Sequence, residues 1–370
     1  MKILVTGGAG FIGSNLVDRL IKENHKVAVV DNLSTGRKEN LNPKAKFYNL
    51  DIQSQKISEV FKKEKPDVVF HLAAQIDVRK SVDDPIKDAK TNILGSLNII
   101  QNFISVNSRQ NSRKFRKFIF ASTGGAIYGD ADIVPTPETY PEFPLSPYGI
   151  CKLTVEKYLN YYWKIFGLPY VALRYANVYG PCQNSKGEAG VIAIFCDKML
   201  SGNQPIINGN GRQTRDFVYV DDVVEANILA MKSKKIGVYN IGTAKETDIN
   251  TIFRQLKKLT DSQCKEVHSP AKPGEQKRSC LDFSKAKKEL GWQPSVNLDR
   301  GLKTTVEYFK NQIKSYISFN SFLAFSHHSF IKATKTPINN PRTIAITIFN
   351  IRLDPLGFLG TIGAFITFVG

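Results

Sequence analysis

A glycine-rich turn near the start of the chain constrains the fold more than any other feature of the sequence. Residues 6–13 read TGGAGFIG and separate the apolar run Lys2–Thr6 from an amphipathic stretch. A strand, a glycine turn and a helix in this order predict a dinucleotide-binding unit, because the phosphates can meet free N–H groups at the start of the helix. We expect Gly7 to permit the tight turn, Gly10 to let the pyrophosphate approach the backbone, and Gly13 to allow close contact between helix and sheet.

Two acidic residues that follow predicted strands indicate the type of cofactor. Asp31 ends the second strand, at the distance from the glycine turn where an acid binds the adenosine ribose hydroxyls. An acid there repels the 2′-phosphate of NADP, so we expect NAD. The pair Asp51 and Ile52 follows the third strand and would hold the adenine edge, although Asp51 fits an ordinary turn equally well.

Short β-rich runs alternate with amphipathic segments of helical length along the first half of the chain. The expected strands are Lys2–Thr6, Lys26–Asp31, Ala45–Leu50, Asp67–His71 and Phe115–Ser122, with Val171–Arg174 and Val238–Ile241 as further strands of the same sheet. The expected helices are Ile12–Glu23, Ile57–Lys65 and Lys90–Ser105. This alternation predicts an α/β fold of the Rossmann type, a doubly wound parallel sheet, over residues 1–180, with segments around 210–245 completing the sheet.

The pattern changes twice in the second half of the chain. Residues 181–315 are rich in turn formers and are expected to form a smaller C-terminal substrate-binding lobe, with helices over Asp248–Leu259, Ser284–Leu290 and Asp299–Lys310. From about Tyr316 charge becomes sparse, and the final apolar run, 357–370, is shorter than the ~20 residues that a membrane-spanning helix needs. We expect 316–370 to be a loosely ordered extension outside the main fold rather than a membrane-associated tail, and we expect no membrane contact of the core.

The chain carries a formal net charge of +18 over 370 residues. The Lys and Arg residues are spread along the sequence. They are not accompanied by a zinc motif or by interleaved aromatic residues, which nucleic-acid-binding segments often contain. We interpret them as a solvated exterior with a few cations focused on a phosphorylated substrate, in preference to a nucleic-acid or membrane surface. The five cysteines are widely spaced and form no CxxC pair, which argues against disulfides or a metal site and favours the cytoplasm. The strand-like run at the start leaves no room for a signal peptide.

Tyr148 and Lys152 form the strongest candidate for a catalytic pair. They lie four residues apart in SPYGICK, at the start of a predicted helix, so that both lie on one helix face. An unperturbed tyrosine, with a pKa of about 10, is a poor base at neutral pH, but a cation within a few Å stabilises its phenolate. Lys152 would also reach the nicotinamide ribose. Ser122 and Thr123 stand where a strand ends, so either a hydroxyl there bonds the substrate oxygen that exchanges a proton, or the two form a plain strand-to-loop turn.

Several motifs in a fixed order resemble the extended short-chain dehydrogenase/reductase family, and within it the UDP-glucose 4-epimerases. The glycine spacing GxxGxxG favours short-chain reductases over proteins with the commoner GxGxxG. The resemblance covers about residues 1–312 and not the tail. It rests on TGGAGFIGSNLV (6–17), DNLSTG (31–36), HLAAQ (71–75), ASTGGAIYG (121–129), SPYGICK (146–152), LRYANVYGP (173–181), GNGRQTRDFVYVDDV (209–223) and GWQPS (291–295).

The resemblance implies roles for individual residues. Tyr148 would be the base, Lys152 its partner, and Thr123 the hydroxyl at the catalytic Ser/Thr position. The cofactor would be bound by Gly7, Gly10, Phe11, Ile12, Gly13, Asp31, Asn32, Asp51, Ile52, Leu72, Ala73, Ala74, Asn92, Tyr148, Lys152 and Tyr175. The UDP-sugar would be bound by Thr123, Tyr148, Asn177, Val191, Arg215, Lys272, Glu275 and Ser279. Arg215 also suits a diphosphate on chemical grounds, because its planar fork matches phosphate oxygens.

Two positions depart from the family pattern. Lys272, ahead of Gly274 and Glu275, stands where a second phosphate-binding arginine is expected, and Arg278 is a candidate to replace it. Ser279 aligns with the position at which a bulky tyrosine restricts the sugar to glucose and galactose. Because a small side chain leaves room for a 2-acetamido group, N-acetylhexosamine sugars are expected as further substrates.

The implied function is the NAD-dependent 4-epimerisation of a UDP-hexose such as UDP-glucose or UDP-galactose, through a transient 4-keto sugar. A UDP-glucuronate 4-epimerase is the alternative, as is a related nucleotide-sugar dehydratase or decarboxylase. The dehydratases place an Asp-Glu pair after the catalytic Thr, whereas Gly124 and Gly125 follow here. A non-catalytic NAD-sensing protein would be expected to lose the Tyr/Lys pair. The resemblance also implies a homodimer formed through helices near 92–105 and 150–166.

Overall fold

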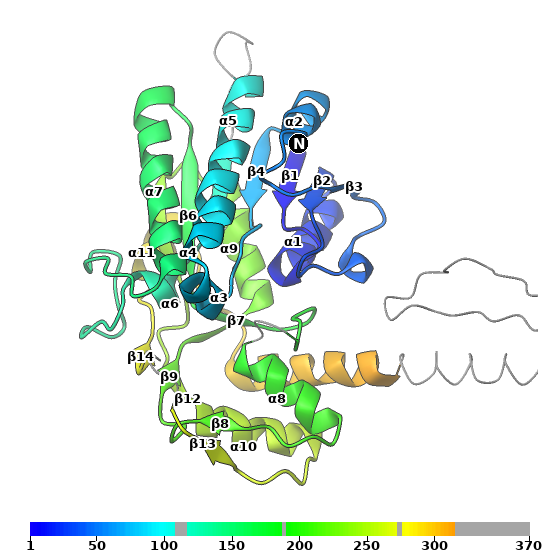
Figure 1. Ribbon diagram of the computed structural model, residues 1–370, viewed down its shortest axis with the longest axis vertical. Helices are drawn as coiled ribbons and strands as arrows, with labels where there is room; N and C mark the ends of the chain where they lie inside the picture. The colour runs from blue at the N-terminus through cyan, green and yellow to red at the C-terminus, as the bar shows by residue number, and fades with distance from the viewer. Residues whose placement is uncertain (108–116, 187–189, 272–275, 315–370) are drawn as a thin grey trace, which may run out of the picture. The chain divides into compact units, whose positions relative to one another are not determined.

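The computed structural model describes residues 1–107, 117–186, 190–271 and 276–314. Within them, a seven-stranded sheet lies at the centre of the unit Met1–Gln312 (Figure 1). The strand order is β11-β6-β5-β4-β1-β2-β3, and all neighbouring strands are parallel. The chain changes direction across the sheet between β1 and β4, which confirms the predicted doubly wound arrangement. The predicted extension 316–370 lies outside the described residues.

The strands of this sheet consist of almost uninterrupted apolar residues because helices cover both of its faces. Their bounds differ from the predicted ones by no more than two residues. They are β1 (Lys2–Thr6), β2 (Lys26–Asp31), β3 (Lys46–Asn49), β4 (Val68–His71), β5 (Lys117–Thr123), β6 (Tyr170–Tyr175) and β11 (Gly237–Ile241).

Alternate side chains of each strand pack against different helices. Ile3 and Val5 of β1 join a core formed with α1 (Phe11–Lys22), α9 (Val220–Lys232) and α11 (Ser284–Leu290). Leu4, between them, points to the opposite core, formed with α2 (Ile57–Glu64), α5 (Gly95–Asn107) and α7 (Pro147–Phe166). Each face of the sheet is therefore closed, and the strand ends are left for binding.

The predicted helix Lys90–Ser105 differs from the structure in its first turn. Residues Lys90–Leu94 form a π-helix, η2, and α5 begins at Gly95. Apolar spacing does not reveal such an insertion of one residue, and π-turns of this kind occur frequently at functional sites. The short elements around it are η1 (Lys38–Asn40), α3 (Val78–Asp83), α4 (Pro85–Ala89) and α6 (Gly124–Ile127).

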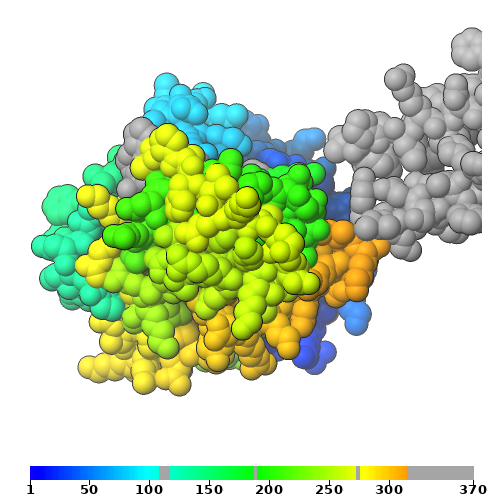
Figure 2. All heavy atoms as spheres, turned by 90° about the horizontal axis from the view of Figure 1, so that it is seen from below, coloured from blue at the N-terminus to red at the C-terminus, as the bar shows by residue number. Residues whose placement is uncertain are grey.

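The second half of the chain adds a lobe below the carboxyl ends of the strands (Figures 1 and 2). Its core joins Phe195 of α8 (Val191–Leu200), Phe253 of α10 (Ile249–Thr260) and Leu302 of a helix over 298–314. Its short strands pair as β7 (Asn177–Tyr179) with β10 (Phe217–Tyr219), β8 (Ile207–Asn208) with β13 (His268–Ser269), and β9 (Thr214–Arg215) with both β12 (Thr247–Asp248) and β14 (Arg278–Ser279).

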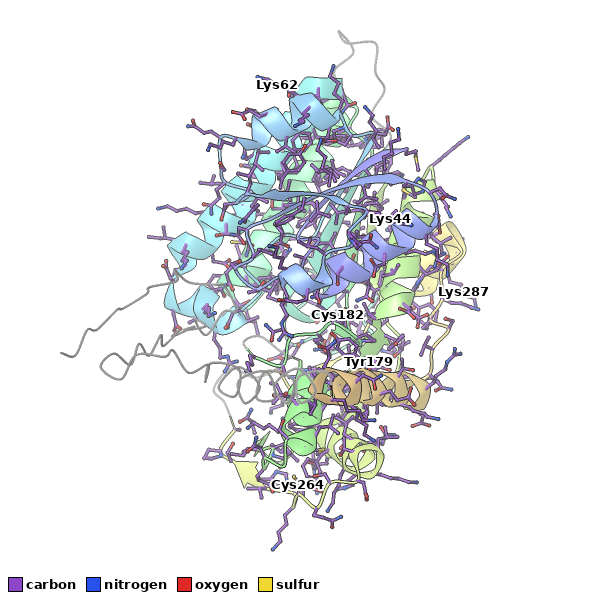
Figure 3. The ribbon with its side chains drawn as sticks, turned by 90° about the vertical axis from the view of Figure 1, so that its right-hand side faces the viewer. Lys44, Lys62, Tyr179, Cys182, Cys264 and Lys287 are labelled. Carbon is purple, nitrogen blue, oxygen red and sulfur yellow. The ribbon has the colours of Figure 1, made fainter. Side chains whose placement is uncertain are left out.

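Tyr179 joins the sheet domain to this lobe (Figure 3). Its ring is buried, and a Cβ on Gly301 would lie 2.1 Å from its hydroxyl, so the C-terminal helix can approach it only through a glycine. All five cysteines are free thiols, as the sequence predicts. Among the described residues no helix combines the length and the apolar character needed to cross a membrane.

Candidate active site

The parallel register gathers the predicted site residues at one edge of the sheet. Thr6 pairs with His71 at the ends of β1 and β4, and Thr123 pairs with Tyr175 at the ends of β5 and β6. Asp31 is the last residue of β2. Because parallel strands end at the same side, segments far apart in the sequence form one continuous edge.

The glycine turn has the shape that a dinucleotide requires. A Cβ on Gly13 would lie 2.1 Å from Gly7 O, and one on Gly7, whose φ is +72°, would lie 2.7 Å from Ala73 N. A Cβ on Gly10 would meet only Gly7 O, at 3.2 Å, so the outer side of the turn is open. The helix α1 begins at Phe11 without a capping side chain, which leaves its first N–H groups available to an anion. These residues fit the diphosphate of NAD.

The Asp31 side chain connects the glycine turn to the loop that follows β2. Its carboxylate accepts hydrogen bonds from Ala9 N at 2.9 Å and from Leu33 N at 2.8 Å. Burial raises the pKa of this carboxyl above its ordinary value, while the two amides act against that rise. Asn32 Nδ2 donates to Asp51 Oδ2 at 2.8 Å, so the structure brings the predicted adenine-side residues together.

A hydrogen-bonded chain connects the glycine turn to the π-helix. Ala73 N donates to Thr6 Oγ1, which lies 2.7 Å from Nδ1 of the buried His71. His71 Nε2 lies 2.9 Å from Ser96 Oγ, and that hydroxyl donates to Asn92 O. Burial lowers the pKa of His71 to about 3, so the ring is neutral. Because the Ser96 hydroxyl donates to Asn92 O, it accepts from Nε2, which therefore carries the ring proton. The segment Leu72–Ala74 is thereby fixed between the predicted cofactor residues.

The predicted catalytic pair, Tyr148 and Lys152, lies at the start of α7. Ser146 caps this helix by accepting from Gly149 N, Pro147 takes its first position, and Tyr148 is half-buried. Lys152 Nζ lies 5.8 Å from the centre of the Tyr148 ring and donates to Ala121 O at 2.8 Å. Burial lowers the pKa of Lys152 to about 8. The predicted pairing on one helix face is therefore present.

The structure distinguishes the two hydroxyls at the end of β5. Ser122 is buried and donates to Glu156 Oε1 at 2.6 Å, whereas Thr123 is half-buried at the sheet edge and begins the turn into α6. Glu156 forms a buried ion pair with Arg174, with Nη2 and Oε2 2.6 Å apart. Ser122 therefore joins the core network, and Thr123 is the hydroxyl left for a substrate.

Of the predicted sugar-binding residues, the structure brings Arg215 and Ser279 of the lobe together beside the loop that follows Thr123. Ser279 pairs in register with Arg215, and a Cβ on Gly125 would lie 3.8 Å from Ser279 Oγ. Asn177 N donates to Asp216 O, which ties β7 to the same segment. Val191 is the first residue of α8. Lys272 and Glu275 lie outside the described residues.

Tyr175 and Arg278 are among the predicted residues that are already engaged within the fold. The Tyr175 hydroxyl donates to Asn227 Oδ1 at 3.1 Å and accepts from Asn227 Nδ2 at 2.8 Å. Arg278 Nε donates a hydrogen bond to Glu246 Oε1 at 2.9 Å, and Arg278 Nη2 donates a second one to Glu246 Oε2. This side of the Arg278 guanidinium fork is thus not left for a diphosphate, which makes Arg278 a weak candidate for a diphosphate ligand.

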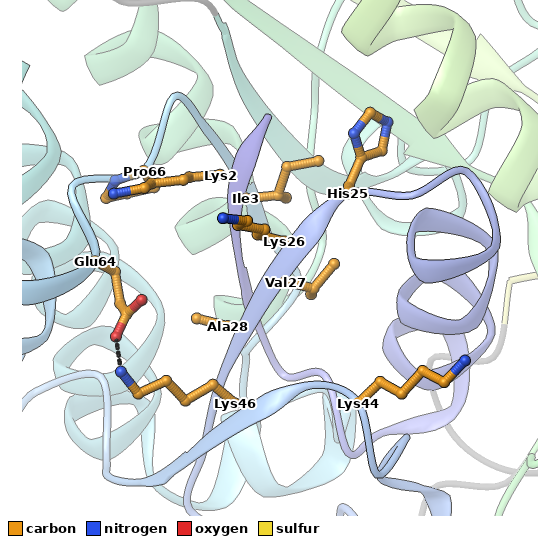
Figure 4. Close-up of a pocket in the computed structure, with 10 residues that line it drawn as sticks. All are labelled: Lys2, Ile3, His25, Lys26, Val27, Ala28, Lys44, Lys46, Glu64 and Pro66. Carbon is orange, nitrogen blue, oxygen red and sulfur yellow. Dashed lines mark hydrogen bonds and ion pairs between the residues drawn. The ribbon is translucent and has the colours of Figure 1, made fainter.

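A separate pocket of about 330 Å³ lies at the opposite end of the sheet (Figure 4). It opens where β1, β2 and β3 begin, and Lys2, Lys26 and Lys46 are the first residues of these strands. Lys46 is paired with Glu64. None of the predicted site residues in the described part of the chain lines this pocket.

The sequence analysis missed the polar groups behind the catalytic pair. Glu156 follows Lys152 by four residues, as Lys152 follows Tyr148, so helical spacing alone could have marked it. Asp88 is also buried and contacts Asn92, one helical turn later. Its burial depends on the packing of α4 against α7, which sequence spacing does not reveal.

Comparison with known proteins identifies the relatives of the chain. Residues 3–242 match the NAD dependent epimerase/dehydratase family. The chain is 47% identical over 309 residues to a putative UDP-glucose 4-epimerase of Methanocaldococcus jannaschii, covering 84% of this chain and 98% of the relative. It resembles the crystal structure of a Thermotoga maritima UDP-glucose 4-epimerase with UDP-glucose (TM-score 0.82, 50% identity, 85% and 100% coverage). It also resembles the Thermus thermophilus enzyme in complex with NAD (TM-score 0.78, 39% identity, 84% and 99% coverage).

Two alanine substitutions separate the roles of the glycines. Gly10→Ala should fold with nearly unchanged stability and weaken NAD binding at least tenfold, about 1.4 kcal/mol, because the added methyl faces the ligand side of the turn. Gly13→Ala should lower the free energy of unfolding of the cofactor-free protein by about 1–3 kcal/mol, because its Cβ overlaps Gly7 O. Calorimetric titration with NAD and thermal unfolding check both. Equal effects of the two variants on both measurements would contradict this assignment.

Proposed function

The chain belongs to the NAD dependent epimerase/dehydratase family, and on that premise we propose that it interconverts the C4 epimers of a UDP-hexose. The observation that carries the proposal is the convergence of two sets of residues. Tyr148, Lys152 and Thr123 lie at the carboxyl edge of the sheet, and the lobe strands with Arg215 and Ser279 lie beside the loop that follows Thr123. This arrangement combines a proton-transferring group with a binding surface for a nucleotide sugar.

The proton is handled by the residues of α7 and β5. Tyr148, as the phenolate, takes the proton of the sugar 4-hydroxyl, and the Lys152 ammonium stabilises the phenolate through its charge. The Thr123 hydroxyl bonds the same sugar oxygen. When C4 is reduced again from its other face, Tyr148 returns the proton, so that no proton is gained or lost over a turnover.

NAD, when bound, supplies the oxidising and reducing power at C4. The residues that would hold it are those of the glycine turn, Asp31 and Lys152, and the open side of the turn at Gly10 fits its diphosphate. The Asn92 amide is bonded to Asp88 and Gln75 and would act on the cofactor only through Gln75. Since the sugar must turn over between the two half-reactions, binding should be strong on the UDP and weak on the hexose. Arg215 supplies a bidentate donor for the diphosphate, and the glycines after Thr123 leave space around the ring.

Ser279 supports a second, finer proposal about the sugar. Its side chain is small, buried and within van der Waals distance of a Cβ placed on Gly125, so it borders the loop next to Thr123. A serine at this place leaves more room than a tyrosine would. We therefore expect the site to accept a 2-acetamido group and to epimerise UDP-N-acetylhexosamines as well.

The proposal is tested by incubating the purified protein with UDP-galactose, UDP-N-acetylgalactosamine or UDP-glucuronate without added NAD and identifying the C4 epimers. We expect conversion of the first two. Tyr148→Phe should reduce turnover at least a thousandfold, about 4 kcal/mol, because the base is lost while NAD binding is retained.

Each outcome of this experiment has a separate meaning. Conversion of none of the sugars by protein that retains its cofactor would refute the epimerase proposal. Conversion of UDP-glucuronate alone would favour the glucuronate alternative, and conversion of UDP-galactose alone would refute the argument from Ser279. Full activity of Tyr148→Phe would show that Tyr148 is not the base.

We also propose that a second copy of the chain covers the apolar face of α4, η2 and α7. Ile150, Tyr161 and Ile165 follow helical spacing along α7 and are 48–64% exposed, and Ile86 and Leu94 are 68% and 58% exposed. Monomeric proteins rarely leave such a surface in water. Ile86 and Leu94 precede α5, whose own large apolar side chains are buried or half-buried. The proposed contact therefore overlaps the start of the predicted range 92–105 and extends before it.

Ile165→Asp tests this contact. We expect sedimentation of the wild type as a dimer at micromolar concentration and of the variant as a monomer, because a buried unpaired carboxylate opposes association. Ile133→Asp, which changes an equally exposed isoleucine in a loop, is the control and should stay dimeric. A monomeric wild type, or a dimeric Ile165→Asp, would contradict the proposal.

A further inference from the structure

A buried carboxylate lies behind the catalytic lysine. Asp88 of α4 is 1% exposed. Its Oδ1 accepts from Gln75 Nε2 and from Asn92 Nδ2, each at 2.9 Å. Asn92 in turn bonds the backbone N and O of Gln75 at 2.8 Å. One oxygen of Asp88 therefore orients two side-chain amides that lie beside the predicted cofactor site.

The other oxygen of Asp88 lacks such partners. Oδ2 is buried and has no hydrogen-bond donor within the part of the chain that the structure describes. The Cys151 thiol, a weak donor, faces the carboxylate without forming a bond of normal geometry, and burial together with this carboxylate raises the pKa of that thiol to about 12. A buried carboxylate without full hydrogen bonding is costly, so a nearby positive charge is expected to offset it.

Lys152, next to Cys151 on α7, provides that charge. Burial lowers its pKa to about 8, and the acidic groups near it act in the opposite direction: Asp88 most, then Cys151 and Glu156. Glu156 is already balanced by Arg174 at 2.6 Å. Asp88 has no ion pair with a cation in the described residues, but its helix α4 packs against α7 and its carboxylate contacts Cys151, the residue before Lys152. The buried carboxylate and the buried ammonium therefore belong to one cluster between these two helices.

The remaining groups around Lys152 do not replace Asp88. From β4, His71 is neutral because burial lowers its pKa to about 3. From β5, the Phe120 ring lies 4.8 Å from Nζ, and Ala121 O accepts one of its protons. From its own helix, the Tyr148 ring lies 5.8 Å away. An ammonium has three donors, and among the described residues one of them has a hydrogen-bond partner.

We propose that Asp88 is a positioning residue for the epimerase reaction, whose carboxylate keeps the Lys152 ammonium charged while it orients Asn92 and Gln75. The inference rests on the proposed function, because the charge on Lys152 matters for catalysis only if Tyr148 acts as a phenolate. Without the Asp88 charge, the ammonium loses its proton at a lower pH, and the phenolate loses its partner.

Asp88→Asn tests the charge without changing the shape. The asparagine oxygen can still accept from Gln75 and Asn92, so only the charge is removed. With lysines labelled by ¹³C at Cε, the resonance of Lys152, identified by its absence from Lys152→Met, is titrated with pH. We expect the titration midpoint to fall by at least about one pH unit relative to the wild type, a tenfold change in protonation at a given pH. In the pH profile of kcat, the decrease at alkaline pH should likewise begin at a lower pH.

Three further variants make the test decisive. Cys151→Ala removes the neighbouring thiol and keeps the carboxylate, so the midpoint should stay at the wild-type value. Asp88→Glu keeps the charge, so its Lys152 titration midpoint should lie close to the wild-type value. If Asp88→Asn does not fold, Asp88→Ser, which removes the charge with a smaller side chain, should give the same lowered midpoint.

An unchanged Lys152 midpoint in folded Asp88→Asn or Asp88→Ser would overturn the proposal, even if activity falls, because a purely structural role would reduce activity without moving the titration. The titration does not require turnover. Its outcome is therefore separable from a failure of the epimerase assignment, which would appear as an absence of sugar conversion by the wild type.

Discussion

The parallel pairing of β1 with β2 and β4, continued through β5 and β6, is the constraint on which the rest of the structure depends. It places the ends of strands that are more than 100 residues apart in sequence at one edge, so that the glycine turn, Asp31, Thr123 and α7 face the same space. The same register leaves the lysine-lined pocket at the other edge without any of these groups. The lobe then needs only short strands such as β9 and β14 to bring Arg215 and Ser279 to that edge.

The proposed catalytic pair lies next to a buried set of charges. Tyr148, Lys152 and Glu156 succeed one another at intervals of four residues along α7, from the half-buried helix start into the core. Glu156 is neutralised by Arg174 and accepts a hydrogen bond from Ser122, the strand residue before Thr123. Asp88 approaches the same helix from α4, and we propose that its charge acts on Lys152. Buried ions lose their hydration, so this arrangement costs folding free energy. We interpret it as a means of keeping the Lys152 amine protonated.

Much of this was predictable from the sequence, because the signals are local. The glycine spacing, the acid at the end of β2 and the Tyr148–Lys152 interval each express the geometry of one turn, one strand end or one helix face. The predictions that fell short depend on contacts between elements. Apolar spacing did not reveal the π-turn at Lys90–Leu94, residue identity did not separate Ser122 from Thr123, and nothing local marked Asp88, which is buried only because α4 packs on α7.

The central claim is that C4 of the sugar loses its hydrogen and regains it inside one site, with Tyr148 exchanging only the hydroxyl proton. The most direct measurement is the fate of deuterium placed at C4 of UDP-galactose during conversion by the wild-type protein in ordinary water, followed by mass spectrometry and NMR of the product. The account predicts UDP-glucose that keeps the deuterium at C4. Product in which C4 carries hydrogen from the solvent would contradict it.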